Sequence, residues 1–238
     1  MYVYGKNQVL ELLRSSPQKV EKVLIAQKTH LPAELLRLLE SLYAPVIHVE
    51  RDKLTRLAGT ENHQGILAFV RDLDFSSPED IARDVIVNKG LLLILDHVKD
   101  PQNLGNIVRS AEAFGASGVV IPAFKASGFT ETVVRASAGA IFNVRVAVVK
   151  NVLNYVRYLK ESGIWVYSLE RGGKDLYKAT FNFPLALIAG AEDEGVSKSI
   201  LKESDEIVTI SMVGKINSLN VASSVAIALS WIFHLKGA

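Results

Sequence analysis

The second half of the chain alternates between short, nearly unbroken apolar runs and longer segments in which apolar residues recur every three or four positions. Short apolar runs are typical of strands that are buried on both faces, and the longer period is typical of amphipathic helices. The pattern predicts strands at 91–95, 118–121, 144–148, 165–169, 185–189 and 207–210, helices at 104–114, 152–160, 198–201 and 220–234, and a further segment at 135–140. Because strands and helices that alternate in this way build a mostly parallel sheet, we expect an α/β fold.

The first seventy residues predict a smaller α/β unit, with helices at 7–13, from Pro32 onward and at 52–57, and strands at 20–26, 46–49 and 66–70. The helix after Pro32 has the clearest signal, since Leu35, Leu38, Leu39 and Leu42 follow the i, i+3, i+4, i+7 spacing of one helical face. Proline suits the first turn of a helix because its missing N–H needs no partner there.

The apolar pattern stops around Phe75, and the segment that follows combines a loop with the start of a helix. Ser77 stands three residues before Asp80, the arrangement of a capping box. We therefore expect a first domain at residues 1–75, a short linker with a helical end at residues 76–89, and a second domain at residues 90–238.

The last predicted helix is apolar on nearly every side, so it requires burial on more than one face. It can lie between the sheet and a second subunit, or it can be an internal core helix of a monomer. The residues that make it apolar are Val221, Ala222, Val225, Ala226, Ile227, Ala228, Leu229, Trp231, Ile232 and Phe233.

Composition narrows the class of protein. A chain of 238 residues that is 49% hydrophobic and 22% charged is far too apolar to be disordered. It has no apolar run near 18 residues and no charged-then-apolar leader, so we expect a soluble, cytoplasmic protein without a membrane anchor. The chain has no cysteine, and its 5 histidines show no ligand spacing, which excludes thiolate chemistry and argues against a metal site.

The net charge does not indicate a nucleic-acid partner, because the chain carries only +2 at pH 7. Residues 1–75 hold 10 basic and 9 acidic side chains, so neither half is strongly basic. A nucleic acid would have to meet a local patch that folding creates, or these side chains form an ordinary solvated surface. The basic residues of the first domain that could form a patch are Lys19, Lys22, Lys28, Arg51, Lys53 and Arg56.

Polar or glycine-bearing loops follow three of the predicted strands, and we expect them to share one site. Residues 96–109 follow the first strand of the second half, residues 190–195 follow a later one, and residues 211–220 follow the last. Parallel sheets bind ligands at the carboxyl ends of their strands, which lie at one edge. None of these loops spells a dinucleotide-binding glycine motif, a P-loop or a hydrolase nucleophile elbow.

These loops also carry a resemblance to a known family. Asp100-Pro101-x-Asn103-x-Gly105 with Arg109, Gly190-x-Glu192-x-x-Gly195, and Ser218-Leu219-Asn220 are similar to the three signature motifs of the SpoU/TrmH-type ribose methyltransferases of the SPOUT superfamily. The resemblance implies a deep trefoil knot, a homodimer that packs through the last helix, and transfer of a methyl group from S-adenosylmethionine to a ribose 2′-hydroxyl of RNA, leaving S-adenosylhomocysteine.

The first domain carries a shorter resemblance. Tyr4-Gly5-Lys6-Asn7 and the segment from His63-Gln64-Gly65 to Ala68 resemble the substrate-binding extension of the branch that methylates a guanosine in large-subunit ribosomal RNA. The resemblance implies that this domain binds the RNA. A transfer RNA substrate or an adenosine target stays open, and so does an RNA-binding or assembly factor that keeps the fold without turnover.

By resemblance, the cofactor pocket is lined by Gly190, Ile210 and Leu219, with Ala191 and Met212 nearby. The catalytic set is Arg109, Asn103, Glu192, Ser218 and Asn220. The family's arginine has been assigned the proton-abstracting role, but a guanidinium is effectively always protonated, so Arg109 can instead bind an RNA phosphate and orient the hydroxyl.

Some of these residues have other interpretations. Asn103 stands at a predicted helix N-cap, and Glu192 can simply favour the positive end of the next helix. His97 is a second candidate proton acceptor, although a lone loop histidine is more often solvated. The family pattern has proline where this chain has Ser211, which leaves one more backbone N–H to satisfy in the third loop.

Overall fold

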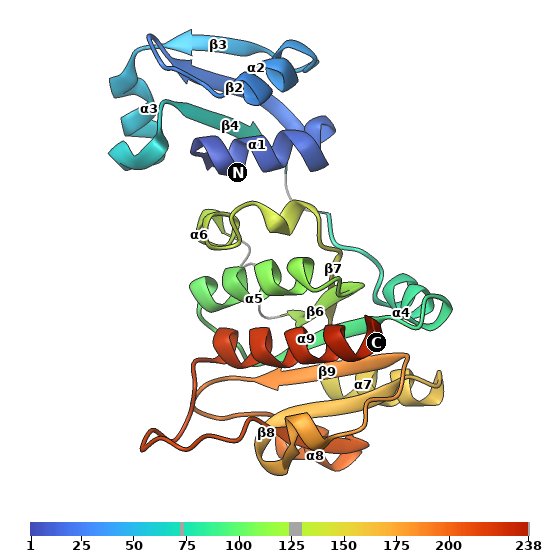
Figure 1. The fold of residues 1–238 in the computed structure, drawn as a ribbon. Helices are drawn as coiled ribbons and strands as arrows, with labels where there is room; N and C mark the ends of the chain where they lie inside the picture. The colour runs from blue at the N-terminus through green and yellow to red at the C-terminus, as the bar shows by residue number, and fades with distance from the viewer. Residues whose placement is uncertain (72–73, 124–129, 238) are drawn as a thin grey trace.

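The computed structural model describes residues 1–71, 74–123 and 130–237. In this part of the chain two sheets lie one above the other, the first built from the N-terminal residues and the second from the rest (Figure 1). The first sheet has the order β1-β4-β2-β3, in which β2 and β3 are parallel and the other pairs antiparallel. Its elements are β1 (Tyr2–Tyr4), α1 (Lys6–Ser15), η1 (Pro17–Lys19), β2 (Val20–Ala26), α2 (Ala33–Glu40), β3 (Val46–Val49), α3 (Arg51–Ala58), η2 (Glu61–His63) and β4 (Ile66–Val70).

Alternate residues of β2 explain how this sheet is covered. Val23 and Ile25 pack with α1 and α2 in one apolar cluster, whereas Leu24 and Ala26 pack with Leu54 of α3 in another. The helix predicted from Pro32 begins at Ala33, with Pro32 in the N-cap position. The sequence pattern did not reveal β1, because three residues are too few to display the period of a strand.

The segment predicted as a linker contains a helix that packs against the second sheet. Helix α4 (Pro78–Val87) begins as predicted, because the Ser77 hydroxyl oxygen accepts the Asp80 N–H at 3.3 Å. Ile81 and Val85 of α4 are fully buried beside strand residues such as Leu92. The segment therefore belongs to the core of the second unit.

The second sheet has the order β10-β8-β9-β5-β6-β7, and all of its strand pairs are parallel, where the pattern predicted a mostly parallel sheet. Helices α5 and α9 cover one face, and α4, α7 and α8 cover the other (Figure 1). Its elements are β5 (Leu91–Asp96), α5 (Pro101–Ala113), β6 (Gly118–Pro122), α6 (Glu131–Ala136), η4 (Ala140–Phe142), β7 (Val146–Val149), α7 (Val152–Glu161), β8 (Trp165–Asp175), η5 (Leu176–Lys178), β9 (Leu185–Gly190), α8 (Lys198–Glu203), β10 (Glu206–Thr209) and α9 (Val221–Gly237).

Strand β8 runs beyond its predicted end and contains a wide bulge. Ser168 pairs with Ile207 of β10, but the next residue of β10, Val208, pairs with Lys174, so residues 169–173 have no direct partner in β10. Within the bulge, a Cβ on Gly173 would lie 2.4 Å from the Ile207 carbonyl oxygen. Because a side chain at position 173 would clash with Ile207, glycine is required there for β8 and β10 to pair again after the bulge.

Helix α9 buries one face in its own chain. Val225, Ala228 and Leu229 belong to the cluster that contains the buried residues of α5, while Phe233 is 55% exposed. A single chain therefore covers only part of the apolar surface that the sequence displays. Among the described residues, no helix is long and apolar enough to cross a bilayer, and no group of three or more histidine, aspartate or glutamate residues is placed to hold a metal ion.

Replacing Ser77 with alanine should destabilise the protein by about 1 kcal/mol, because the first turn of α4 loses its side-chain acceptor. For a chain of this size we expect a fall in Tm of roughly 2–4 °C in thermal unfolding followed by circular dichroism. Ser77→Asp keeps an acceptor at the same position and should retain the wild-type Tm. Equal losses in both variants would contradict this role for the cap.

Candidate active site

A cavity of about 300 Å³ opens at the carboxyl ends of β8, β9 and β10. Its walls include apolar side chains from all three strands or the loops that follow them, such as Leu169, Ile210 and Leu219. The size suits a small organic ligand. Of the predicted site residues, the cavity is lined by Gly190, Ala191, Glu192, Ile210, Met212, Ser218 and Leu219.

Gly190 gives the cavity its shape at the end of β9. A Cβ on this residue would lie 2.0 Å from the carbonyl carbon and oxygen of Gly195 and 2.3 Å from the Val196 nitrogen. Any side chain at position 190 would therefore push the 195–196 segment away. The backbone turns back tightly here, and Ala191 and Gly195 form an isolated bridge.

A carboxylate beside the cavity joins the three predicted loops. The Glu192 Oε1 oxygen accepts the Asn103 side-chain amide at 3.2 Å and the Val221 N–H at 3.3 Å, and it also accepts the Asn220 amide. The Asn220 amide in addition donates to the Asn103 side-chain oxygen at 2.9 Å. The structure thus brings Asn103, Glu192 and Asn220 together from positions far apart in the chain.

The two asparagines play different local roles. Asn220 caps α9, because its side-chain oxygen accepts the Ala222 N–H at 2.9 Å. The predicted N-cap role of Asn103 is wrong: Asp100 caps α5 by accepting the N–H groups of Gln102 and Asn103 at 3.1 and 3.3 Å. Pro101 takes the first helical position, so α5 begins three residues earlier than predicted. Asn103 therefore lies inside the helix, and its side chain reaches Glu192 instead of capping.

Arg109 lies apart from this cluster. Its side chain is exposed on α5, it does not line the cavity, and no hydrogen bond or ion pair joins it to any residue in the described part of the chain. Six residues separate it from Asn103, which places the two side chains about 120° apart around the helix. Arg109 is therefore neither a lining residue of the cavity nor bonded to the Asn103–Glu192–Asn220 cluster, and its predicted catalytic role stays a prediction.

The first loop is tied to the second at its base. The buried Asp96 accepts both the Ser197 N–H at 2.8 Å and the Ser197 hydroxyl at 2.5 Å, and its other oxygen contacts the His97 Nδ1 nitrogen at 2.5 Å. Lys99 lies 3.0 Å from Glu194, and this hydrogen bond raises the pKa of Lys99. The geometry directs one nitrogen of His97 toward Asp96 rather than toward the cavity.

The bulge of β8 contributes two cavity residues, Glu170 and Arg171, that are not among the predicted site residues. The Glu170 carboxylate accepts the Val196 N–H at 2.8 Å, and the Arg171 guanidinium donates to the Asn217 carbonyl at 3.3 Å. Both residues follow the predicted strand at 165–169, so the rule that identified the other loops, polar residues directly after a parallel strand, could have found them.

Ser211, at the position where the family pattern has proline, has a partner in the structure. Its hydroxyl donates to the Asp175 carboxylate at the end of β8, and this hydrogen bond lowers the pKa of Asp175. The third loop is therefore held by the extended strand at its start and by Arg171 near its end. The loop between them is exposed, with Val213 and Ile216 largely in solvent.

Comparison with known families agrees with this arrangement. A family model described as the SpoU rRNA methylase family matches residues 90–230, which is more than half of the chain. This chain belongs to the SpoU rRNA methylase family. A second model, described as RNA 2′-O ribose methyltransferase substrate binding, matches residues 2–76.

Among similar proteins, the 23S rRNA (guanosine-2′-O-)-methyltransferase RlmB of Nitrosomonas europaea is 35% identical over 98% of this chain and 91% of its own length. The protein of the same name from Ralstonia nicotianae is 35% identical over 82% of this chain and 79% of its own. Among solved structures, the SpoU methyltransferase AviRb of Streptomyces viridochromogenes, in complex with AdoMet, has a TM-score of 0.81 at 23% identity, covering 99% of this chain and 90% of that one. At that identity the comparison shows only that this chain and AviRb share a fold.

Replacing Glu192 with alanine should lower the free energy of unfolding by about 1 kcal/mol, because two side-chain amides and one backbone N–H lose a shared acceptor. Urea denaturation provides the measurement. Glu194→Ala is the matched control, since Glu194 is its neighbour in the same loop but makes only an exposed ion pair, and it should cause no measurable change. Equal losses in the two variants would show that Glu192 does not hold the loops.

Proposed function

We propose that this protein transfers a methyl group from S-adenosylmethionine to a ribose 2′-hydroxyl of RNA. The observation that carries the proposal is the cavity at the ends of β8, β9 and β10 with the Asn103–Glu192–Asn220 cluster beside it. The membership of the SpoU family and the names of the two RlmB relatives support the reaction.

The residues of the cavity fit this cofactor. Gly190 lets the loop after β9 fold back against residues 195 and 196, which shapes one wall of the cavity, and Ile210 and Leu219 supply apolar walls. The carboxylates of Glu170 and Glu192 face a cavity that would hold a positively charged sulfonium, which opposite charge favours. When bound, the cofactor supplies an electrophilic methyl group.

The residues beside the cavity would position the ribose. Asn103 and Asn220 offer amides, Glu192 a carboxylate and Ser218 a hydroxyl, so together they can hold a sugar hydroxyl in line with the methyl group. Arg109 keeps its charge throughout, which suits a bidentate grip on an RNA phosphate rather than proton abstraction. The proton of the 2′-hydroxyl would then leave to water as the new bond forms.

We propose a guanosine of large-subunit ribosomal RNA as the target, because the two RlmB relatives carry that activity in their names. Residues 1–75 would form the RNA-binding domain, followed by residues 76–89 as the connection and by the methyltransferase domain at residues 90–238. The match of residues 2–76 to a substrate-binding model supports this division.

We also propose a knotted, homodimeric and cytoplasmic protein. The chain leaves the sheet at its edge strand β10 and returns to pack α9 on α5, over the middle of the sheet, which a trefoil knot requires. The exposed Phe233 on α9 offers a surface to a second copy. Because Arg109 lies away from the cavity of its own chain, the second copy would supply the arginine of each site.

Incubation with radiolabelled S-adenosylmethionine and unmodified large-subunit ribosomal RNA tests the proposed reaction. Label should enter the RNA as a 2′-O-methyl group. Arg109→Ala should lower kcat/KM by about 100-fold or more, since a phosphate contact that orients the hydroxyl is lost, while calorimetric binding of S-adenosylhomocysteine stays unchanged. No label with any RNA, or no heat with S-adenosylhomocysteine, would leave only a non-catalytic RNA-binding role.

Mixing two inactive variants tests whether the arginine acts across a dimer. Gly190→Ala should abolish cofactor binding, because the added Cβ pushes residues 195 and 196 away, and Arg109→Ala should lower kcat/KM by about 100-fold or more. If each site combines one chain's cavity with the other chain's arginine, co-expression should restore about a quarter of wild-type activity, because half of the dimers are mixed and one of their two sites is intact. If the arginine serves its own chain, the mixture stays inactive.

A further inference from the structure

The first domain contacts the second through an apolar interface rather than through the connecting segment alone. Val9 and Leu12 of α1 are fully buried in the same apolar cluster as Val134 of α6 and Ile141 of η4. Domains that are joined only by a linker move relative to one another, and a continuous apolar interface opposes that motion. The position of the first domain is therefore set by the surface on which α1 packs.

A glycine lies at the closest point of this interface. Gly139, in the turn between α6 and η4, is buried and has a φ of +89°. A Cβ built on it would lie 2.7 Å from the Cβ of Glu11 in α1. The turn of the second domain thus touches α1 as closely as a backbone without a side chain allows.

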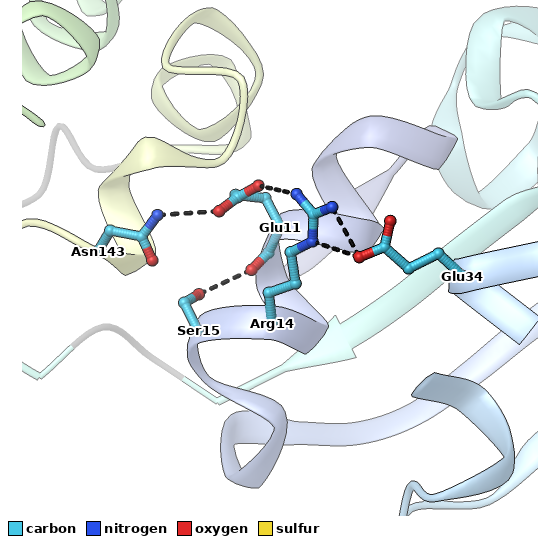
Figure 2. A network of polar contacts seen from close by, with 5 residues as sticks. All are labelled: Glu11, Arg14, Ser15, Glu34 and Asn143. Carbon is cyan, nitrogen blue, oxygen red and sulfur yellow. Dashed lines mark hydrogen bonds and ion pairs between the residues drawn. The ribbon is translucent and has the colours of Figure 1, made fainter. Parts of the chain in front are cut away.

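Polar contacts surround this point and fix Glu11 from both sides (Figure 2). The Asn143 amide of the second domain donates to the Glu11 Oε1 oxygen at 3.0 Å, and Arg14 lies 3.4 Å from the Oε2 oxygen. Arg14 in turn pairs with Glu34 of α2 at 2.7 Å, so this second pair belongs entirely to the first domain. At the other end of the interface, the Arg135 guanidinium donates to the Tyr4 hydroxyl.

A second glycine continues the contact toward the candidate active site. Gly105 of α5 faces α6, where a Cβ would lie 2.5 Å from the Ala136 Cβ and 2.8 Å from the Val133 carbonyl oxygen. Gly105 stands two residues after Asn103 and one helical turn before Arg109. The segment from α6 to η4 therefore packs closely against α1 through Gly139 on one side and against the helix of the candidate site through Gly105 on the other.

We propose that these two glycine contacts make the first domain, the α6–η4 segment and α5 one rigid unit, and that Gly139 is a positioning residue for RNA. The proposal rests on the proposed function, since it assigns to the unit the task of holding RNA at a fixed distance from Asn103 and Arg109. A folded RNA that contacts both the first domain and the cavity gains affinity from this preorganisation. No described residue of the first domain, of the α6–η4 segment or of α5 lines the cofactor cavity, so binding of S-adenosylhomocysteine can be measured separately from RNA binding.

A substitution that adds one methyl group at the interface between the domains tests the proposal. Gly139→Ala places a methyl group against Glu11 and should separate α1 from the turn. Gly163→Ala is the matched control, because Gly163 has a similar φ of +83° and an added Cβ there meets nothing within 4 Å. Both variants carry the same backbone strain, so a difference between them reports the interface alone.

For Gly139→Ala we expect KM for in-vitro-transcribed large-subunit ribosomal RNA to rise about tenfold, with binding of S-adenosylhomocysteine unchanged and a larger radius of gyration in small-angle X-ray scattering. Gly163→Ala should match the wild type in all three. An unchanged KM and radius, or an equal rise of KM in both variants, would overturn the proposal. If the wild type methylates no RNA, the proposed function fails, and the scattering comparison still decides whether the unit is rigid.

A second pair of variants decides the matter if Gly139→Ala does not fold. Tyr4→Phe with Asn143→Ala removes two of the polar contacts between the domains without adding any atom. Tyr155→Phe with Glu34→Gln removes one tyrosine hydrogen bond and weakens one exposed contact inside single domains. Relative to the wild type, the increase in KM and the increase in the radius of gyration should each be several times larger for the first pair than for the second. Equal increases for the two pairs would overturn the proposal.

Discussion

The candidate site depends on a single carboxylate. Glu192, in the second loop, receives hydrogen bonds from Asn103 of the first loop and from Asn220 and the Val221 N–H at the end of the third. The sheet alone only places these three loops at one edge. Each bond to a charged acceptor contributes more than a neutral one, and together they hold two side-chain amides in fixed orientations. The cavity, the start of α9 and the start of α5 therefore keep one arrangement.

Glycines make this arrangement sterically possible. Gly190 lets the loop after β9 fold back on itself, Gly173 lets β8 rejoin β10 after its bulge, and Gly105 lets α5 touch α6. In each case the neighbour is backbone or a Cβ, which cannot move aside as the end of a flexible side chain can. The same kind of contact at Gly139 extends the chain of rigid neighbours from the site to the first domain.

Much of this protein could be predicted from hydrophobic patterning because burial and periodicity are local properties. The runs at β2, β3 and β4 coincide with the predicted strands. Strands β5, β6 and β9 of the second sheet are buried along their whole length, which is typical of a parallel sheet. Residues 76–89 were harder, since a composition typical of a loop precedes a helix whose Ile81 and Val85 pack on the sheet. The three residues of β1 carried no periodic signal at all.

The sequence by itself determined which residues carry polar chemistry and that they follow parallel strands, because both depend only on residue type and spacing. Tertiary structure decided which of them meet. Asp100 rather than Asn103 caps α5, the bulge of β8 brings Glu170 and Arg171 to the cavity, and Arg109 projects from another side of its helix. Each of these depends on strand register or on the rotation of a helix about its axis, and both are set by packing between segments distant in the chain.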